Sequence, residues 1–183
     1  MAKHKRVRPP PRSRRVVGQD GTTAVVFERD PVASVGKTVW ARMTERMHPP
    51  TARTVAVATV MTAPVTCVTC DLGVETVAAL FLDEHIGALP VVDEEGQPIG
   101  ILTKSDLMRS RIADARFPRT SILELMTPIV TTVHENESVA RAASLMLEQR
   151  VHHLPVVDDE RGVVGMVSTF DFARFLATGP GTP

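Results

Sequence analysis

Two short motifs combine a hydroxyl with a carboxylate at the expected start of a helix. Residues 103–106 read TKSD and residues 168–171 read STFD, so an aspartate follows three residues after a threonine or serine in both. One interpretation is a capping box, in which hydroxyl and carboxylate accept reciprocal backbone hydrogen bonds. The other is a ligand site, because a helix N-terminus offers free N–H groups to phosphate and a carboxylate can accept both hydroxyls of a ribose. Both interpretations remain open on the residues alone.

A pair of histidines precedes the second motif. His152 and His153 can each donate a hydrogen bond to a phosphate, or they can be hydrogen-bonded structural residues. Adjacent residues on a strand point to opposite faces, so we expect at most one of them to enter a given cleft.

The two cysteines form a CxxC sequence, Cys67 to Cys70, that raises a redox or zinc interpretation. A structural zinc site takes four ligands, and the chain has no second CxxC and no HxxxH. Cys67 also falls on an expected strand, whereas reactive cysteines favour helix N-termini. We therefore expect two free thiols and no metal site. The chain also lacks a GxSxG, P-loop, Rossmann glycine or HExxH pattern, so we expect no enzyme activity.

The elements that carry these residues belong to an internal repeat with a spacing of 65 residues. The segment LPVVD occurs at 89–93 and again at 154–158, and VMT at 60–62 corresponds to LMT at 125–127. Further matched positions are Gly100 with Gly165, Asp106 with Asp171, and Arg109 with Arg174. A unit of about 50 residues is small for an independent core, so the two units should pack on each other.

The hydrophobic period within each unit predicts the order strand, helix, strand, strand, helix. Apolar residues at helical spacing run from Val74 to Phe81 and from Val139 to Leu147. β-branched runs and acidic, glycine-containing loops follow, at 93–97 and 158–162, which predicts hairpins. Second helices are expected from about 106 to 116 and from about 171 to 177.

The 21 Lys and Arg balance the 21 Asp and Glu, but residues 1–15 hold seven of the bases and no acid. Residues 1–30 are basic and Pro-rich, which predicts a disordered tail. Residues 31–56 form a linker, in which apolar residues from Val35 to Met47 predict a short amphipathic helix that ends before Pro49. No apolar run approaches the roughly 18 residues of a membrane span and no secretory signal is evident, so we expect a cytoplasmic protein.

These motifs, present twice and in the same order, closely resemble a cystathionine-β-synthase (CBS) domain pair, the Bateman module, of the stand-alone type. The resemblance places CBS domain 1 at 57–118 and CBS domain 2 at 119–177, followed by a C-terminal tail at 178–183. It implies an α/β fold of two tandem β-α-β-β-α repeats packed about a pseudo-two-fold axis. It also implies clefts for adenosine-containing ligands and pairing into a homodimer.

The resemblance further implies a non-catalytic regulatory module that binds an AMP-like or adenosyl ligand, such as an adenine nucleotide or S-adenosylmethionine, with no required cofactor. The client protein stays unidentified. In the family, the aspartate contacts ribose and the hydroxyls contact phosphate or ribose, and a basic residue often lies on the strand that precedes the motif. The ligand-binding residues expected on this ground are Thr103, Ser105, Asp106, Ser168, Thr169, Asp171, His152 and His153.

Two other functions stay open. A structural or adaptor module with empty clefts is favoured by Gly87 and Ala88, which stand where the second repeat has histidines, and by Phe170 in place of a hydroxyl. A nucleic-acid-associated regulator would act through residues 1–15, although that segment has no aromatic residues for base stacking.

Overall fold

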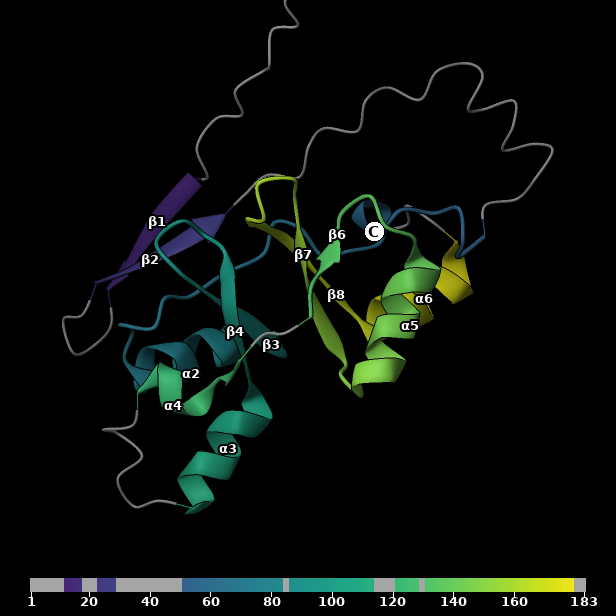
Figure 1. The fold of residues 1–183 in the computed structure, drawn as a ribbon. Coiled ribbons are helices and arrows are strands. Elements are labelled where there is room, and N and C mark those ends of the chain that lie inside the picture. The colour runs from purple at the N-terminus through teal and green to yellow at the C-terminus, as the bar shows by residue number, and fades with distance from the viewer. Residues whose placement is uncertain are drawn as a thin grey trace, which may run out of the picture.

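The structure, a computed structural model, describes residues 12–17, 23–28, 51–83, 86–113, 121–128 and 131–179. The two repeats form two α/β lobes that lie next to each other (Figure 1). The expected helix between Val35 and Met47 lies outside the described residues, as does the end of the C-terminal tail. Among the described residues, no helix is long and apolar enough to cross a membrane.

The first lobe is a three-stranded sheet in the order β3-β4-β5. Its strands are β3 Ala88–Val92, β4 Pro98–Thr103 and β5 Thr127–Pro128, and its helices are α2 Val74–Asp83, α3 Lys104–Ala113 and α4 Ile122–Leu125. The 3-10 helix η1, Val57–Thr59, precedes it. Strand β5 belongs to the opening of the second repeat, so a segment of the second repeat completes the sheet of the first.

The second lobe has the sheet order β6-β7-β8. Its strands are β6 Val133–His134, β7 His153–Val157 and β8 Val163–Ser168, and its helices are α5 Val139–Gln149 and α6 Thr169–Thr178. Strand β6 pairs parallel with β7, and the first repeat has a single parallel bridge, Val68 to Val91, at the matching place. The order strand, helix, strand, strand, helix is confirmed in the second repeat; in the first repeat the helix, two strands and helix are present, and the expected opening strand is reduced to the single bridge at Val68.

The two hairpins have the same register. Val91 pairs with Gly100 in the first and Val156 with Gly165 in the second, and a bulge follows at the same place in each. The hairpin tips are joined across the lobes, because the Val163 amide donates to the Gly96 carbonyl at 3.1 Å.

The opening segment of each repeat packs on the sheet of the other. Thr62 bridges to Met166 through two backbone hydrogen bonds of 2.8 and 3.1 Å, and Gly100 pairs with Pro128 of β5. A glycine on each crossed strand leaves room for the crossing segment. A Cβ on Gly165 would overlap the sulfur of Met61, and one on Gly100 would overlap the sulfur of Met126.

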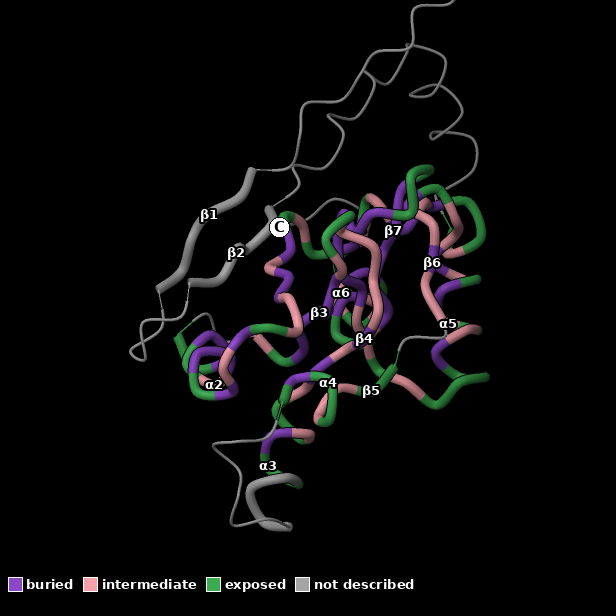
Figure 2. The backbone as a smooth tube through the Cα atoms, turned by 60° about the vertical axis from the view of Figure 1, so that its left-hand side comes forward, coloured by how far each residue is buried: buried purple, intermediate pink, exposed green. Residues whose placement is uncertain are grey.

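Buried residues form one cluster in each lobe and a third between them. The third cluster combines first-repeat residues with second-repeat residues and contains Val65, Cys67, Ala88, Val92, Val163 and Met166. Figure 2 shows the buried stretches running through β3 and β7. This shared burial satisfies the expectation that two small units must pack on each other.

Residues 51–60 attach to the second repeat rather than to the first. The amides of Val139 and Ala140, at the start of α5, donate to the carbonyls of Val55 and Ala52 at 2.9 and 2.7 Å. The Val57 amide donates to the Glu137 carbonyl at 2.8 Å. The segment therefore satisfies amides that the helix itself leaves without acceptors.

Two expectations need correction. Residues 1–30 were expected to be disordered, but the structure has an antiparallel pair within them, β1 Arg12–Val17 and β2 Thr23–Glu28. Both strands contain residues that favour β-structure, namely Val16, Val17 and the run from Val25 to Phe27. The prediction of disorder rested on the basic and Pro-rich composition of the whole segment and did not take these residues into account. Helices α3 and α6 also begin two residues before the expected 106 and 171, because the aspartate is the third helical residue and not the first.

Candidate functional site

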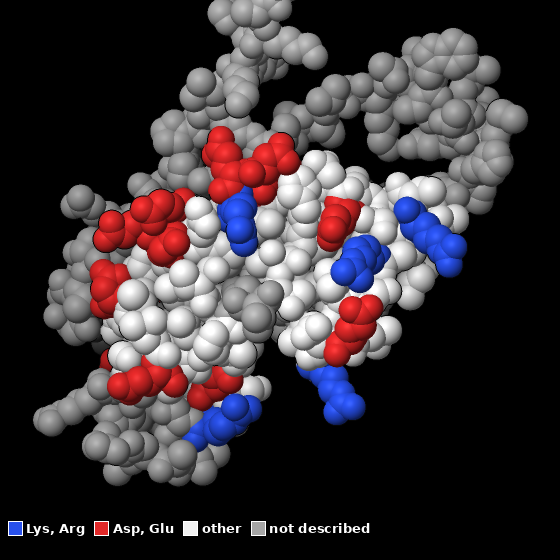
Figure 3. Space-filling view, viewed as in Figure 1, with Lys and Arg blue, Asp and Glu red and all other residues white. Residues whose placement is uncertain are grey.

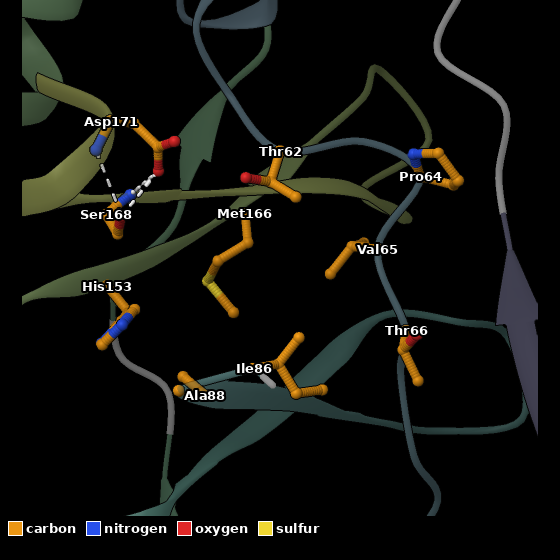
Figure 4. Close-up of a pocket in the computed structure, with 11 residues that line it drawn as sticks. Thr62, Pro64, Val65, Thr66, Ile86, Ala88, His153, Met166, Ser168 and Asp171 are labelled. Carbon is orange, nitrogen blue, oxygen red and sulfur yellow. Dashed lines mark hydrogen bonds between the residues drawn. The ribbon is translucent and has the colours of Figure 1, made fainter. Parts of the chain in front are cut away.

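A cavity of about 310 Å³ lies between the lobes and takes its walls from both repeats (Figure 4). The first repeat contributes Thr62, Pro64, Val65, Thr66, Ile86, Gly87 and Ala88, and the second contributes His153, Met166, Ser168 and Asp171. Small-molecule pockets typically measure roughly 300–1,000 Å³ and combine apolar walls with a few polar groups. The cavity has this composition, with hydroxyls and one carboxylate among aliphatic side chains.

The polar end of the cavity is the start of α6. The Asp171 Oδ2 atom accepts from the Ser168 amide at 2.8 Å and from the Ser168 hydroxyl at 2.6 Å. The Asp171 amide donates back to the Ser168 hydroxyl at 3.3 Å, which completes a capping box. The capping interpretation is therefore correct, and the same two side chains also face the cavity.

Asp171 is almost fully buried, at 3% exposure, and Arg174 compensates its charge. The guanidinium Nη2 atom donates to Asp171 Oδ1 at 2.9 Å and to the Val60 carbonyl at 3.2 Å. A buried carboxylate needs such a partner, because removal of a charge from water is costly.

The first repeat has the same box without these surroundings. The Thr103 amide and hydroxyl donate to Asp106 Oδ2 at 2.9 and 2.6 Å, and the Asp106 amide donates to the Thr103 hydroxyl at 3.3 Å. Arg109 is 78% exposed and lies 3.8 Å from Asp106. Thr103 and Asp106 do not line the described cavity, and Ser105 is exposed.

The two histidines lie in different environments. His153 begins β7 and lines the cavity, whereas His152 is exposed and its carbonyl accepts from the Thr169 amide at 3.0 Å. Burial lowers the pKa of His153, the neighbouring His152 lowers it further, and Asp171 opposes both effects. His153 therefore favours the neutral imidazole.

Of the expected site residues, the cavity brings together Ser168, Asp171 and His153, while Thr169 is exposed on α6. The sequence reasoning missed the first-repeat wall. Thr62 and Thr66 recur as Thr127 and Thr131 at the repeat spacing, and this recurrence could have identified them. The apolar wall residues Val65 and Ile86 carry no such chemical signal.

Neither cysteine is in a disulfide; Cys67 is buried and Cys70 is half-buried. In the described part of the chain, no group of three or more His, Cys, Asp or Glu residues is placed to hold a metal ion.

Comparison with known proteins supports a common architecture. The chain is 34% identical over 119 residues to hypoxic response protein 1 of Mycobacterium tuberculosis, an alignment that covers 64% of this chain and 82% of that protein. It is 34% identical over 106 residues to L-aspartate semialdehyde sulfurtransferase of Methanocaldococcus jannaschii, covering 58% of this chain but 20% of that enzyme. The chain spans between 20% and 47% of the length of the first three curated relatives that it matches.

Among solved structures, the CBS domain pair of protein MJ0100, in complex with 5′-methylthioadenosine and S-adenosyl-L-methionine, matches with a TM-score of 0.60 and 32% identity. The match covers 67% of this chain and 96% of that one. The family model of the CBS domain matches twice, at residues 57–113 and 122–178, which are the two repeats described above. The chain therefore belongs to the CBS domain family and carries two CBS domains in tandem.

Proposed function

We propose that this chain is a non-catalytic regulatory module that binds an adenosine-containing ligand in the cavity between its two CBS repeats. The observation that carries the proposal is the Ser168–Asp171 box, which presents a hydroxyl and a carboxylate to a cavity of about 310 Å³. The solved relative MJ0100 holds two adenosyl compounds. In this chain, Asp171 and Ser168 would bind the ribose, and the apolar wall from Val65 and Ile86 would cover the base.

The charges at the site favour an adenosyl ligand without a polyphosphate. Among the described residues, the lining contains no Lys or Arg, and the guanidinium of Arg174, which lies beside the lining, is already bound to Asp171. At the other ends of β3 and β7 from the cavity, the hairpin tips carry the exposed acids Glu94, Glu95, Asp159 and Glu160, and Figure 3 shows several groups of acidic side chains on one face of the described chain. A triphosphate would bring charge that no lining residue neutralises, whereas a neutral or cationic ligand such as 5′-methylthioadenosine or S-adenosylmethionine would not.

Regulation follows from the position of the cavity. Thr62 and Ala88 come from one repeat and Met166 from the other, so a bound molecule would favour one relative arrangement of the lobes. A ligand can shift such an equilibrium only by its differential affinity for the two arrangements. The readout would be a change in affinity for a client protein.

The test is a thermal-shift and calorimetric panel with 5′-methylthioadenosine, S-adenosylmethionine, adenosine, AMP, ADP, ATP and NAD. A ligand specific for the folded state raises the melting temperature. We expect the first three to do so most strongly and Asp171→Asn to remove the effect. Asp106→Asn disrupts the equivalent capping box of the first repeat, which does not line the described cavity, and should keep most of the ligand-induced rise in melting temperature. The absence of a shift with every compound, or an equal response in Asp171→Asn, contradicts the proposal.

A second function is favoured by a different surface. Helices α5 and α6 pack together and carry large exposed apolar side chains, with Leu147 81%, Leu176 80% and Phe170 73% exposed. Such residues are typical of a docking surface, for a second copy in a homodimer or for a client. Sedimentation of Leu147→Glu and Leu176→Glu tests this adaptor function. If these variants sediment as the natural chain does at every concentration, the surface is not used for self-association.

A further inference from the structure

We propose that Arg174 is a positioning residue that sets the ribose specificity of the cavity by fixing Asp171 and tying it to the opening segment of the first repeat, which packs on the second lobe. This inference rests on the proposed function and assigns a role to a side chain that does not line the cavity itself.

One nitrogen atom of Arg174 joins helix α6 to the opening segment of the first repeat. Arg174 Nη2 donates to Asp171 Oδ1 at 2.9 Å and to the Val60 carbonyl at 3.2 Å. Val60 is buried and belongs to the opening of the first repeat, two residues before Thr62 in the cavity wall. Arg174 therefore links the carboxylate on α6 to the segment that crosses from the other repeat.

The same contacts limit which acceptor positions a ligand can use. A carboxylate has about four lone-pair positions. Ser168 donates twice to Oδ2, and Arg174 donates once to Oδ1. The lone pair that remains is on Oδ1, and the hydrogen bond from Arg174 to the same oxygen determines the direction in which this lone pair points. Asp171 can thus accept one ribose hydroxyl in a defined place without rearrangement of the capping box.

The chain contains its own comparison. Arg109 follows Asp106 at the same spacing, but it is 78% exposed and its closest approach to that carboxylate is 3.8 Å. An ion pair at this distance with an exposed arginine contributes little. The two arginines therefore have the same sequence context and different surroundings, which makes Arg109 a matched control.

The experiment measures discrimination between ligands rather than affinity alone. Dissociation constants for adenosine, 2′-deoxyadenosine and 3′-deoxyadenosine are determined by calorimetry for the natural chain, Arg174→Gln, Arg174→Lys and Arg109→Gln. In the natural chain, loss of the hydroxyl bound to the charged carboxylate should weaken binding about tenfold. Arg174→Gln should reduce this ratio to about twofold or less, because the carboxylate is no longer held in one direction.

The control and the conservative variant separate positioning from general support of the fold. Arg109→Gln should retain the full ratio. Arg174→Lys keeps the charge but has no planar guanidinium, and should give an intermediate ratio; it also replaces Arg174→Gln if that variant does not fold. If Arg174→Gln weakens all three nucleosides equally and keeps the natural ratio, or if Arg174→Lys retains that ratio in full, the inference is wrong. Binding of no nucleoside by the natural chain overturns the proposed function and the role of Arg174 together.

Discussion

Met126 places its sulfur directly over Gly100, on the sheet of the other repeat, and Met61 and Gly165 form the corresponding pair. Each glycine lies on the strand that the opening segment of the other repeat crosses. The close approach explains why both positions lack a side chain, and it leads to the first prediction.

Gly100→Ala and Gly165→Ala should each destabilise the fold by about 1–3 kcal/mol, because the added Cβ overlaps a packed methionine. Thermal unfolding followed by circular dichroism measures the effect. Gly87→Ala is the control, since its Cβ would lie 3.6 Å from the nearest atom of His153, an ordinary contact. Equal melting temperatures for all three variants would show that the methionines move aside at no cost.

Residues 51–56 should stabilise the second repeat. A chain that begins at residue 57 lacks the Val55 and Ala52 carbonyls that accept from the start of α5, and also the buried Val55 side chain. We expect it to be less stable than a chain that begins at residue 51 by roughly 2 kcal/mol or more. Denaturant unfolding of the two fragments, with ellipticity as the signal, provides the comparison. Coincident unfolding curves would contradict the attachment.

Stability should decrease as the pH falls below about 6.5, the ordinary pKa of histidine. Burial lowers the pKa of His153 in the folded protein, so the unfolded chain binds this proton first and is favoured by acid. The loss begins near the unfolded pKa and is complete below the folded one. His153→Gln should flatten the melting temperature over this window, whereas His152→Gln, at an exposed position, should retain most of the slope. An unchanged slope in His153→Gln argues against this origin.

Both cysteines should react as thiols without prior reduction. Cys67 is 2% exposed and Cys70 is half-buried, so Cys70 should react with a thiol reagent first and Cys67 only on unfolding. Reductant should leave the total unchanged. A smaller total before reduction would reveal a disulfide and contradict this expectation.

The sequence predicts the fold well because each motif occurs in two copies, and each copy supports the assignment of the other. The recurrence of LPVVD and of the glycine and aspartate after it located the hairpins and helices of both lobes, and periodicity needed only local residues. The crossing of Met61 and Met126 between lobes depends on contacts far apart in the chain and has no local signal. Strands β1 and β2 were missed because composition was weighed over whole segments, which hides short β-branched runs.

For the site, the sequence identified the residues with distinctive chemistry. Of the predicted residues, Ser168, Asp171 and His153 line the cavity, whereas Thr103 and Asp106 carry the same hydroxyl and carboxylate pattern at a helix start and do not line it. Val65 and Ile86 could not be predicted, since an aliphatic side chain on a wall looks the same in the sequence as one in the core. The different surroundings of Arg109 and Arg174 could not be predicted from the sequence either, because Arg174 is held by the Val60 carbonyl, which is 114 residues away in the chain.

The reciprocal crossing of the openings also determines how the chain can be divided. Each half carries the segment that completes the sheet of the other, so cleavage between residues 113 and 121 would leave two fragments with complementary surfaces. Such fragments would recover the fold by association, and neither would complete it alone. The two domains are thus linked like the halves of a domain-swapped dimer within one chain.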